Sequence, residues 1–515
     1  MPADILQAYA GVNNPPQLIV VPLRDEPREK VVYRILPLGK HHDHLAYNQS
    51  LNNVVSAALE RIFLIKDAAA PNGCRRPVQA VPGAYGANID LRRYLDRLSR
   101  YLGQRTCPIS HEEFCETYRG GKRLMYIREA ETLKLYPIER KDANVNYFMK
   151  AQAQMPGKAP RGISPRSPRY NIELGCYIKP IEHDIYRAID KVYGEPTVAC
   201  GMNAFDLGEL AKSKWDGMND PVLVEIDASH FEQHVGRQAL QFEHTVYQRV
   251  YKNDKLLRRL LSWQTNLKGY ANVRDGFLKW AIDAMRCSGD VTTGVGNKII
   301  MCGLVYAFMR SIGAKPCMLN QGDDCCLFVE RHLLQLVLNR CQPFFAAFGF
   351  DVRVDGVRDH LEEMVFCQMS PVFDGIRWVM CRNPTTACTK DLLMFRDLST
   401  EKKWDEMRAS VADCGLALAG HLPVMGAFYD CLKRGAENAS THKTALGMEW
   451  WAKGLKRSGR TRVTDAARVS FYASFDITPA EQVALETFYD NYVPCFTPPQ
   501  VHEVSYPPET LQILQ

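Results

Sequence analysis

Three aspartates stand where apolar segments of the sequence end. Asp323 and Asp324 follow Gly322 in MLNQGDDCCLF (318–328), and Asp227 closes the apolar run in DPVLVEID (220–227). Desolvating an unpaired carboxylate costs several kcal/mol, so an exposed turn or a bound cation must accommodate these side chains. A turn alone would explain the Gly-Asp-Asp run, because Gly and Asp are both frequent turn residues.

The chemistry that Asp227 and Asp323 could support together is metal-assisted nucleotidyl transfer. Two carboxylates brought together repel each other, and a cation between them relieves that repulsion. Mg²⁺ suits one or two carboxylates plus the phosphates of a substrate. Two such ions about 4 Å apart can activate an attacking hydroxyl and stabilise a leaving pyrophosphate. This interpretation requires a fold that brings the two strand ends side by side.

A polar cluster lies between the two acidic positions and precedes an apolar helix. Its spacing is SGxxxTxxxN, and its members are Ser288, Gly289, Thr293 and Asn297. Hydroxyl and amide groups can read a ribose 2′-OH, and a glycine lets backbone approach a base or template strand closely. The alternative is that the polar side chains cap the following helix. The two roles can coexist.

A basic segment rich in proline precedes these groups. The stretch 139–170 reads ERKDANVNYFMKAQAQMPGKAPRGISPRSPRY and has only two acidic residues. It is either a solvated loop or a semi-rigid arm that presents cations to phosphates. Its cations are Arg140, Lys141, Lys150, Lys158, Arg161, Arg166 and Arg169. A second basic cluster, at 453–462 beside Trp450 and Trp451, fits nucleic-acid binding and a solvated helix end equally well.

The composition is that of an ordinary globular protein large enough for several domains. The chain has 515 residues, of which 46% are hydrophobic and 24% charged, with a net charge of +6. Its 17 cysteines include no CxxC pair, so zinc-site spacing is absent and a reducing compartment is expected. The N-terminus lacks secretory-signal character, and the longest apolar stretch, 299–309, is too short to span a bilayer.

The elements that must position these residues follow from periodicity. The sequence predicts a strand ending at Asp227, a hairpin over 315–330 and a helix followed by a strand over 332–356. It predicts an amphipathic helix at 89–102 and a mainly helical region from residue 390. This alternation predicts an α+β fold with a mixed sheet packed on helices.

Several of these segments resemble one protein family. DASHFEQHV (227–235), SGDVTTGVGNK (288–298) and QGDD (321–324) resemble three successive motifs of the RNA-dependent RNA polymerases of positive-strand RNA plant viruses of the tombusvirus, umbravirus and luteovirus kind. KAPRGISPRSPRYNIELG (158–175) is similar to the basic fingers motif of that group. EEMVFCQMSPVF (362–373) and FYASFDITPAEQVALE (471–486) resemble its later segments. The similarity runs from about residue 105 to 490.

The resemblance implies a closed right hand of fingers, palm and thumb. We expect an N-terminal region and fingers extension at 1–90, fingers with the basic arm at 91–219, a palm at 220–385 with a finger insertion at about 236–285, and a helical thumb at 386–515. It implies that the chain replicates viral RNA from NTPs with Mg²⁺, for which Mn²⁺ can substitute.

The resemblance also implies roles for individual residues. Asp227 and Asp323 would bind metal, with Asp324 in support. The triphosphate would meet Lys158, Arg161, Arg166 and Arg169. Ribose selection would use Glu232, Ser288, Gly289, Thr293 and Asn297. Two positions depart from the pattern of the family: Glu232 stands where an aspartate is usual, and Arg353 stands where many such polymerases have a proton-donating lysine, which leaves the general acid open.

Two alternatives and a set of partners complete the expectations. A reverse transcriptase shares the palm but usually has an aromatic-x-Asp-Asp turn, and a catalytically silent RNA-binding scaffold would explain Glu232. Expected partners are template and nascent RNA, NTPs and a viral auxiliary protein that tethers the chain to membranes in the host cytoplasm. The chain can be part of a longer readthrough or frameshift product.

Overall fold

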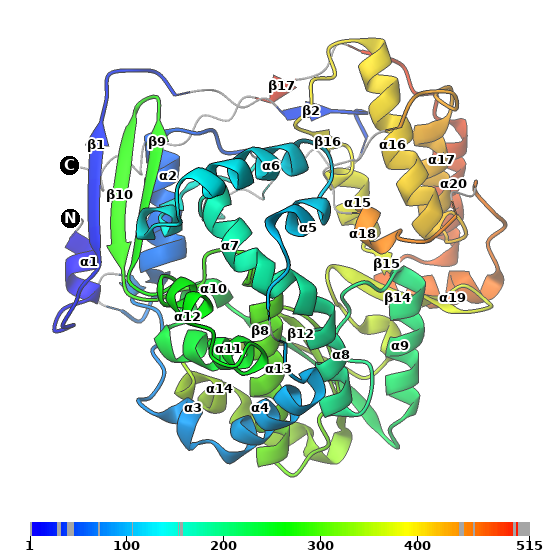
Figure 1. Cartoon of the computed structure of the whole chain (residues 1–515). Coiled ribbons are helices and arrows are strands. Elements are labelled where there is room, and N and C mark those ends of the chain that lie inside the picture. The colour runs from blue at the N-terminus through cyan, green and yellow to red at the C-terminus, as the bar shows by residue number, and fades with distance from the viewer. Residues whose placement is uncertain are drawn as a thin grey trace.

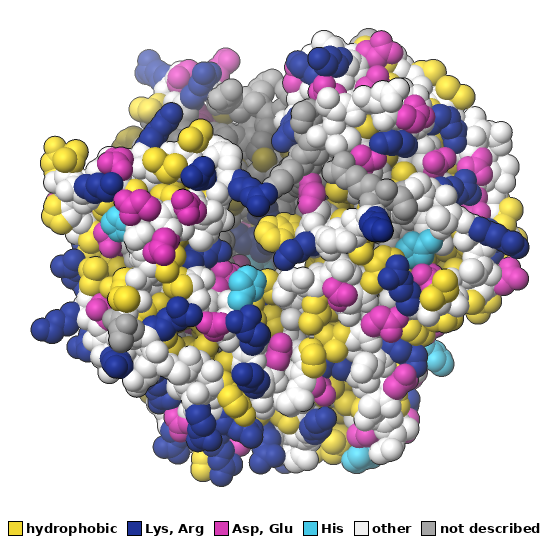
Figure 2. Space-filling view, turned by 45° about the vertical axis from the view of Figure 1, so that its right-hand side comes forward, with side chains coloured by type: hydrophobic (Ala, Val, Ile, Leu, Met, Phe, Trp, Pro, Cys, Tyr) yellow, Lys and Arg dark blue, Asp and Glu magenta, His cyan; other side chains and the backbone are white. Residues whose placement is uncertain are grey.

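The structure is a computed structural model of the chain, and Figure 1 shows helices and sheets arranged in three connected regions. It describes residues 3–27, 32–38, 46–70, 73–105, 107–152, 154, 158–441, 448–456, 459–497 and the backbone of 501–502. The space-filling view in Figure 2 shows the surface hollowed between the two upper regions, with Lys and Arg side chains along the rim. Within the described residues, no helix has the length and apolarity needed to cross a bilayer.

A four-stranded antiparallel sheet lies at the centre of the lower region. Its order is β11 (Met318–Gln321), β12 (Asp324–Glu330), β8 (Pro221–Ala228) and β13 (Val352–Arg358). The expectation of a mixed sheet was wrong here. The crossover helix α14 (Leu334–Ala347) makes β12 and β13 run the same way, but β8 lies between them, so every adjacent pair is antiparallel.

Both faces of this sheet are buried. Alternate residues of β8 enter two different hydrophobic clusters, Val222 and Val224 on one side and Leu223 on the other. Helices α13 (Thr293–Ser311), α4 (Ile89–Leu102) and α8 (Glu182–Tyr193) pack against one another within the first cluster. A strand buried on both faces is a near-continuous apolar run, as the sequence of β8 shows, and its backbone is held on both edges.

A second four-stranded sheet stands at the left edge of Figure 1, and we call it the fingers sheet after the region expected from the sequence. Its order is β1 (Gln17–Pro22), β10 (Gly276–Ile282), β9 (Leu267–Val273) and β5 (Val145–Asn146), with β5 and β9 parallel. Helix α2 (Leu51–Ala58) and the π-helical turn Leu59–Phe63 share one hydrophobic cluster with the inner face of this sheet. Chain segments from the N-terminal region and from the predicted finger insertion therefore form one body.

The remaining elements are mainly helical. The N-terminal and middle parts of the chain also contain α3 (Ala84–Ala87), α5 (His111–Glu116), α6 (Gly120–Leu135), α7 (Pro168–Ile178), α9 (Ala204–Asp216), α10 (Phe231–His234), α11 (Arg237–Val250) and α12 (Lys255–Ser262). The C-terminal part contains β14 (Met369–Phe373), β15 (Trp378–Arg382), α15 (Pro384–Lys390), α16 (Glu401–Ala419), α17 (Met425–Lys433), α18 (Met448–Trp451), α19 (Asp465–Phe475) and α20 (Pro479–Asn491). The short elements are α1 (Ala3–Ala8), β3 (Ile65–Lys66), β4 (Cys74–Arg75), β6 (Phe148–Met149) and β7 (Gly162–Ile163). The predicted helices at 89–102 and beyond residue 390 are confirmed.

A small sheet joins the N-terminal segment to the C-terminal helices. Strand β2 (Val32–Arg34) pairs with β16 (Leu393–Met394) and β17 (Val501–His502). The indole of Trp404 on α16 donates to the carbonyl of Ile35 over 2.6 Å. Strands β1 and β2, which are near each other in the sequence, therefore belong to two different sheets, one with β10 and the other with β16.

We expect Gly269→Ala to destabilise the protein by about 1–3 kcal/mol, because a Cβ at this position of β9 would overlap the buried indole ring of Trp280. Thermal unfolding measures the effect. The control is Gly86→Ala in α3, where a Cβ meets no atom within 4 Å and alanine favours the helix. Equal unfolding midpoints for the two variants would contradict the packing argument.

Candidate active site

The Gly-Asp-Asp run forms the turn of the predicted hairpin. Gln321 pairs with Asp324, and Gly322 has a φ of +86°, which favours glycine. The buried Asn320 clamps the turn, since its amide donates to the carbonyl of Gly322 over 2.8 Å and its side-chain oxygen accepts from the Gly322 N–H over 3.1 Å. The turn therefore has a local cause, and it also fixes two carboxylates at one end of the central sheet.

Asp227 reaches the same end of the sheet on the neighbouring strand. Its predecessor Ile226 pairs with Cys325, so Asp227 and Asp324 lie on adjacent strand ends. The hydroxyl of Ser229 donates to Asp227 Oδ2 over 3.1 Å and accepts from Arg353 over 2.9 Å. Arg353 thus helps to orient Asp227 through Ser229.

The side chains around the carboxylates at this end of the sheet do not fully offset their negative charge. Both Asp323 and Asp324 keep accessible surface, but surrounding protein removes much of the water near them. Burial, followed by the negative charges of Glu232 and Asp324, raises the pKa of Asp323 to about 7. Burial also raises the pKa of Asp324, against a hydrogen bond from the thiol of Cys367 that lowers it.

This donor set fits a divalent cation that also binds substrate. In the part of the chain that the structure describes, no group of three His, Cys, Asp or Glu side chains is arranged to hold an ion by itself. Two or three carboxylates at one end of a sheet would leave coordination positions for phosphate oxygens, which is the manner in which Mg²⁺ is usually bound.

Cations from two distant segments lie on this side of the site, Arg161 where its charge acts on Asp323, and Arg61 in a pocket with Arg161 and Glu232. Strands β6 and β7 form a short hairpin in which the Lys150 N–H donates to the carbonyl of Arg161 over 2.8 Å. The positive charge of Arg161 lowers the pKa of Asp323. Burial is the main cause that lowers the pKa values of Lys150 and Arg61, and the charge of Arg161 lowers them further. Sequence reasoning predicted Arg161 but missed Arg61, which the π-helical turn after α2 supplies from another region of the sequence.

Lys158 is held at its backbone, where its carbonyl accepts from the hydroxyl of Tyr47 over 2.6 Å. Burial is the main cause that lowers the pKa of Lys390, and the positive charges of Arg382 and then Lys158 lower it further. Lys158 therefore lies near α15, which carries Lys390.

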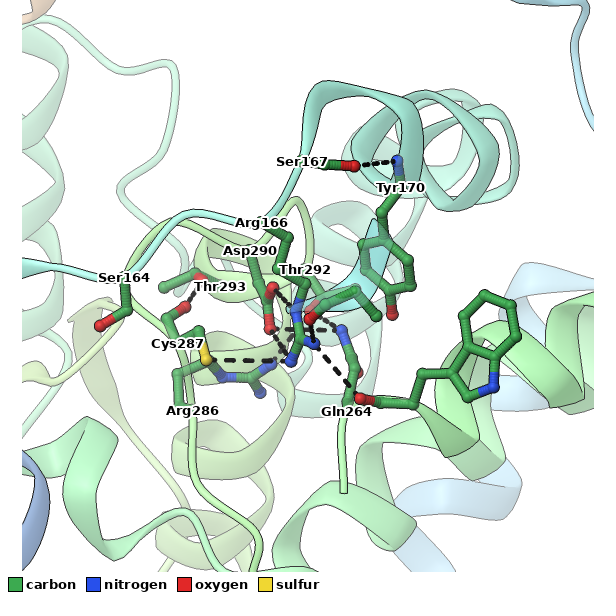
Figure 3. Close-up of polar contacts among 12 residues, drawn as sticks. Ser164, Arg166, Ser167, Tyr170, Gln264, Arg286, Cys287, Asp290, Thr292 and Thr293 are labelled. Atoms are coloured by element: carbon green, nitrogen blue, oxygen red, sulfur yellow. Dashed lines mark hydrogen bonds and ion pairs between the residues drawn. The ribbon is translucent and has the colours of Figure 1, made fainter. Parts of the chain in front are cut away.

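Two of the predicted triphosphate ligands point into the protein, as Figure 3 shows for Arg166. The guanidinium of Arg166 has no exposed surface; it pairs with Asp290 and donates to the carbonyl of Ala143 over 2.6 Å. Arg169 donates to Asp142 over 3.2 Å and to Thr132 over 2.6 Å. Arg166 holds the basic arm in place, because buried charges require such partners, and the expectation that it meets a triphosphate is corrected. Arg169 also bonds to protein partners but keeps some exposed surface, so its role at a triphosphate stays a prediction.

The Ser-Gly pair before α13 is also engaged by the arm. Ser288 Oγ accepts from the Ser164 N–H over 3.1 Å, and a Cβ on Gly289 would lie 2.6 Å from the Cα of Pro165. The close approach that glycine permits is therefore to the arm itself. Thr293 donates its hydroxyl to the carbonyl of Cys287 over 2.6 Å, and the N-cap of α13 is Thr292, without a side-chain cap.

Asn297 is oriented by a buried arginine that sequence reasoning missed. Arg286 Nε donates to Asn297 Oδ1 over 3.1 Å, and Arg286 pairs with Glu243 in the interior, where neither side chain has exposed surface. The backbone N–H of Arg286 also donates to the carbonyl of Glu232 over 3.1 Å. Arg286 thereby connects Asn297 with the segment that carries Glu232. The position of Arg286 two residues before Ser288 could have indicated a role at the site. Its partner Glu243 is 43 residues away in the sequence, so the sequence does not reveal the pairing.

We expect Asp290→Ala to lower the free energy of unfolding by about 3–5 kcal/mol, because it leaves Arg166 charged, buried and unpaired. Urea unfolding followed by tryptophan fluorescence measures the loss. The double variant Arg166→Met/Asp290→Leu should recover much of it. Asp216→Ala, which removes an exposed partner of Lys212, is the control and should change stability by less than about 1 kcal/mol. Equal stability of the two single variants would refute the assigned role.

Asp323→Asn should stabilise the metal-free protein at alkaline pH. The folded pKa of Asp323, about 7, lies above its ordinary value of 3.8, so the folded state binds the extra proton and wild-type stability falls as pH rises between these values. The variant should be more stable than the wild type at pH 8, by an amount that solvent screening of this exposed side chain reduces, and equally stable near pH 4. Urea unfolding in a chelating buffer tests this, and a difference that does not change with pH would contradict it.

Comparison with known proteins identifies the family. A family model described as viral RNA-dependent RNA polymerase matches residues 18–496. The RNA-directed RNA polymerase of Turnip crinkle virus is 37% identical over 487 residues, covering 92% of this chain and 62% of the relative. That of Tobacco necrosis virus (strain A) is 35% identical (93% and 66% covered), and that of Cucumber necrosis virus is 33% identical (96% and 58% covered). The chain thus spans about three fifths of the length of these relatives. The resemblance drawn from the motifs is confirmed: the chain belongs to the viral RNA-dependent RNA polymerase family.

Proposed function

We propose that this chain is the part of a viral replication protein that copies RNA, adding nucleotides from NTPs to an RNA 3′ end. The observation that carries the proposal is the convergence of Asp227, Asp323 and Asp324 at one end of the central sheet, opposite the cations Arg161 and Arg61. The names of the viral relatives support the same activity.

The aspartates and the cations would have separate roles in the reaction. Asp227 and Asp323, with Asp324, would hold divalent ions, Mg²⁺ in our proposal with Mn²⁺ as a substitute; such ions activate the attacking hydroxyl and neutralise the phosphates. Phosphoryl transfer depends mostly on positioning and charge. Arg161, with Lys150 and Arg61 beside it, would bind the triphosphate and offset the charge of the leaving pyrophosphate.

The ribose side of the nucleotide would be read by Asn297. Because Arg286 occupies the amide oxygen of Asn297, the amide NH₂ group is the part that can donate to a 2′-hydroxyl. Glu232, whose charge reaches Asp323, would act from the same side, with Ser288 and Thr293 shaping the wall.

A closed right hand is the arrangement we propose for the whole chain, with the fingers, palm and thumb divided at residues 90, 219 and 385. The pairing of β1 with β10 and of β2 with β16 supports closure, since these two strands are near each other in the sequence and would connect the two regions. Such a bridge would restrain the distance between fingers and thumb.

Asp323→Ala should abolish incorporation of labelled NTPs on a short RNA template with Mg²⁺ or Mn²⁺, while RNA binding persists because the basic surfaces remain. The matched control is Asp220→Ala, which removes an exposed carboxylate just before the other end of β8 and should keep full activity. Product from Asp323→Ala at the wild-type rate would overturn the proposal.

The same assay separates the two alternatives. A reverse transcriptase would incorporate dNTPs in preference to rNTPs, and Gln321, at the position where an aromatic-x-Asp-Asp turn has its aromatic residue, argues against it. A silent scaffold would bind RNA tightly and give no metal-dependent product under any condition. Membrane association in the host cytoplasm through a viral auxiliary protein is part of our proposal, and flotation of the chain with and without that protein tests it.

A further inference from the structure

The outer face of the fingers sheet carries aromatic and basic side chains instead of the polar mixture usual for a solvated face. Alternate residues of β9 and β10 point inward, and Ala271, Leu278 and Trp280 belong to the hydrophobic cluster beneath the sheet. The residues between them point outward. We call the following set the outer face: Ile19, Lys268, Tyr270, Asn272, Phe277 and Lys279.

Strand register places these side chains next to one another. Lys279 pairs with Tyr270 on one side and with Ile19 on the other, and Phe277 pairs with Asn272. Side chains opposite each other in antiparallel strands have Cβ atoms about 5 Å apart. The ammonium of Lys279 lies 5.3 Å from the ring centroid of Phe277. Rings and ammonium groups therefore alternate over adjacent rows of the sheet.

The charge on this face has one sign. The outward residues of β1, β9 and β10 include two lysines and no carboxylate. Arg140 adds a third cation at the end of β9, where it donates to the carbonyl of Asn266 over 3.3 Å. The two acids that flank β10 are engaged elsewhere, Asp275 by the Leu51 N–H over 2.9 Å and Asp283 by Arg237.

A surface hollow lies over the same residues. Its volume is about 340 Å³, and its lining includes Gln17, Asn144, Lys268, Tyr270 and Lys279. The side chain of Tyr270 remains 36% exposed, and that of Ile19 remains 55% exposed. A flat ring can therefore reach Tyr270 while an anion reaches either lysine.

We propose that the outer face of the fingers sheet binds single-stranded RNA, with a base stacked on Tyr270 and phosphates held by Lys268 and Lys279. Stacking on aromatic side chains combined with backbone contacts to cations is how sequence-tolerant binding of single strands is built. The face lies on the opposite side of the sheet from α2 and the turn that carries Arg61, so it is separate from the active site. The inference rests on the proposed function only where it takes the bound RNA to be the template.

The test is direct RNA affinity, measured by fluorescence anisotropy with an unstructured RNA of about 12 nucleotides. The variant is Tyr270→Thr/Lys279→Thr, since threonine keeps strand propensity. We expect its Kd to rise about tenfold or more, because stacking contributes about 1–3 kcal/mol per base. The dependence of log Kd on log salt should also become shallower by about 0.7, one phosphate contact having been lost.

The matched control is Tyr101→Ala/Lys191→Ala, which removes another exposed tyrosine with a lysine 5.8 Å from its ring, on helices α4 and α8. This control should keep wild-type affinity. An unchanged Kd for the Tyr270/Lys279 variant, or an equal loss in both variants, would overturn the proposal. Loss of binding to an acidic viral protein with RNA affinity intact would instead make the face a protein interface.

Folding and catalysis provide independent checks. The Tyr270/Lys279 variant should unfold at the wild-type temperature and incorporate NTPs normally at saturating template, because none of its changes touches the active site. Loss of RNA affinity would support the surface even if the wild-type chain made no product, in which case only the polymerase proposal would fail.

Discussion

The buried ion pair between Arg166 and Asp290 is the constraint on which the site depends. It joins the basic arm to the loop that begins α13, two segments that are 124 residues apart. Burying an ion pair costs more than the attraction returns unless the remaining polar atoms are satisfied. Here they are, because Arg166 also donates to the carbonyls of Ala143 and Trp263, and Gln264 donates to Asp290 over 3.4 Å. Removing any partner would loosen the arm and, with it, Arg161.

A second buried pair extends this network towards Asn297. Arg286 and Glu243 have no exposed surface, and Thr292 and Tyr247 complete their hydrogen bonds at 3.1 Å and 2.8 Å. Two cations and two anions thus form a neutral group in the interior between the arm, α11 and α13. Asn297 adjoins this group, and its hydrogen bond with Arg286 holds its side chain in one orientation.

The carboxylates at the end of the central sheet contrast with this satisfied interior. Asp227 and Asp324 are held by strands that are hydrogen-bonded along their edges, so their positions do not relax when their charges repel. Burial and the negative charges of Glu232 and Asp324 raise the pKa of Asp323. The structural ion pairs in the interior are neutral. The carboxylates at the end of the central sheet keep unbalanced negative charge, which in our proposal a metal ion neutralises when it binds together with a triphosphate.

The sequence by itself determined the elements whose causes are local, and the family. The hairpin around Gly322, the strand ending at Asp227 and the long helices follow from residue type and spacing, because a two-residue turn and a buried strand leave clear patterns. Only the tertiary structure decided the partners. Arg161 and Arg166 are alike in sequence, yet one faces the carboxylates and the other is buried, since Asp290 is present beside only the second. Arg61 joined the site, and β8 came to lie between β12 and β13, through contacts between segments far apart in the chain, which no local pattern records.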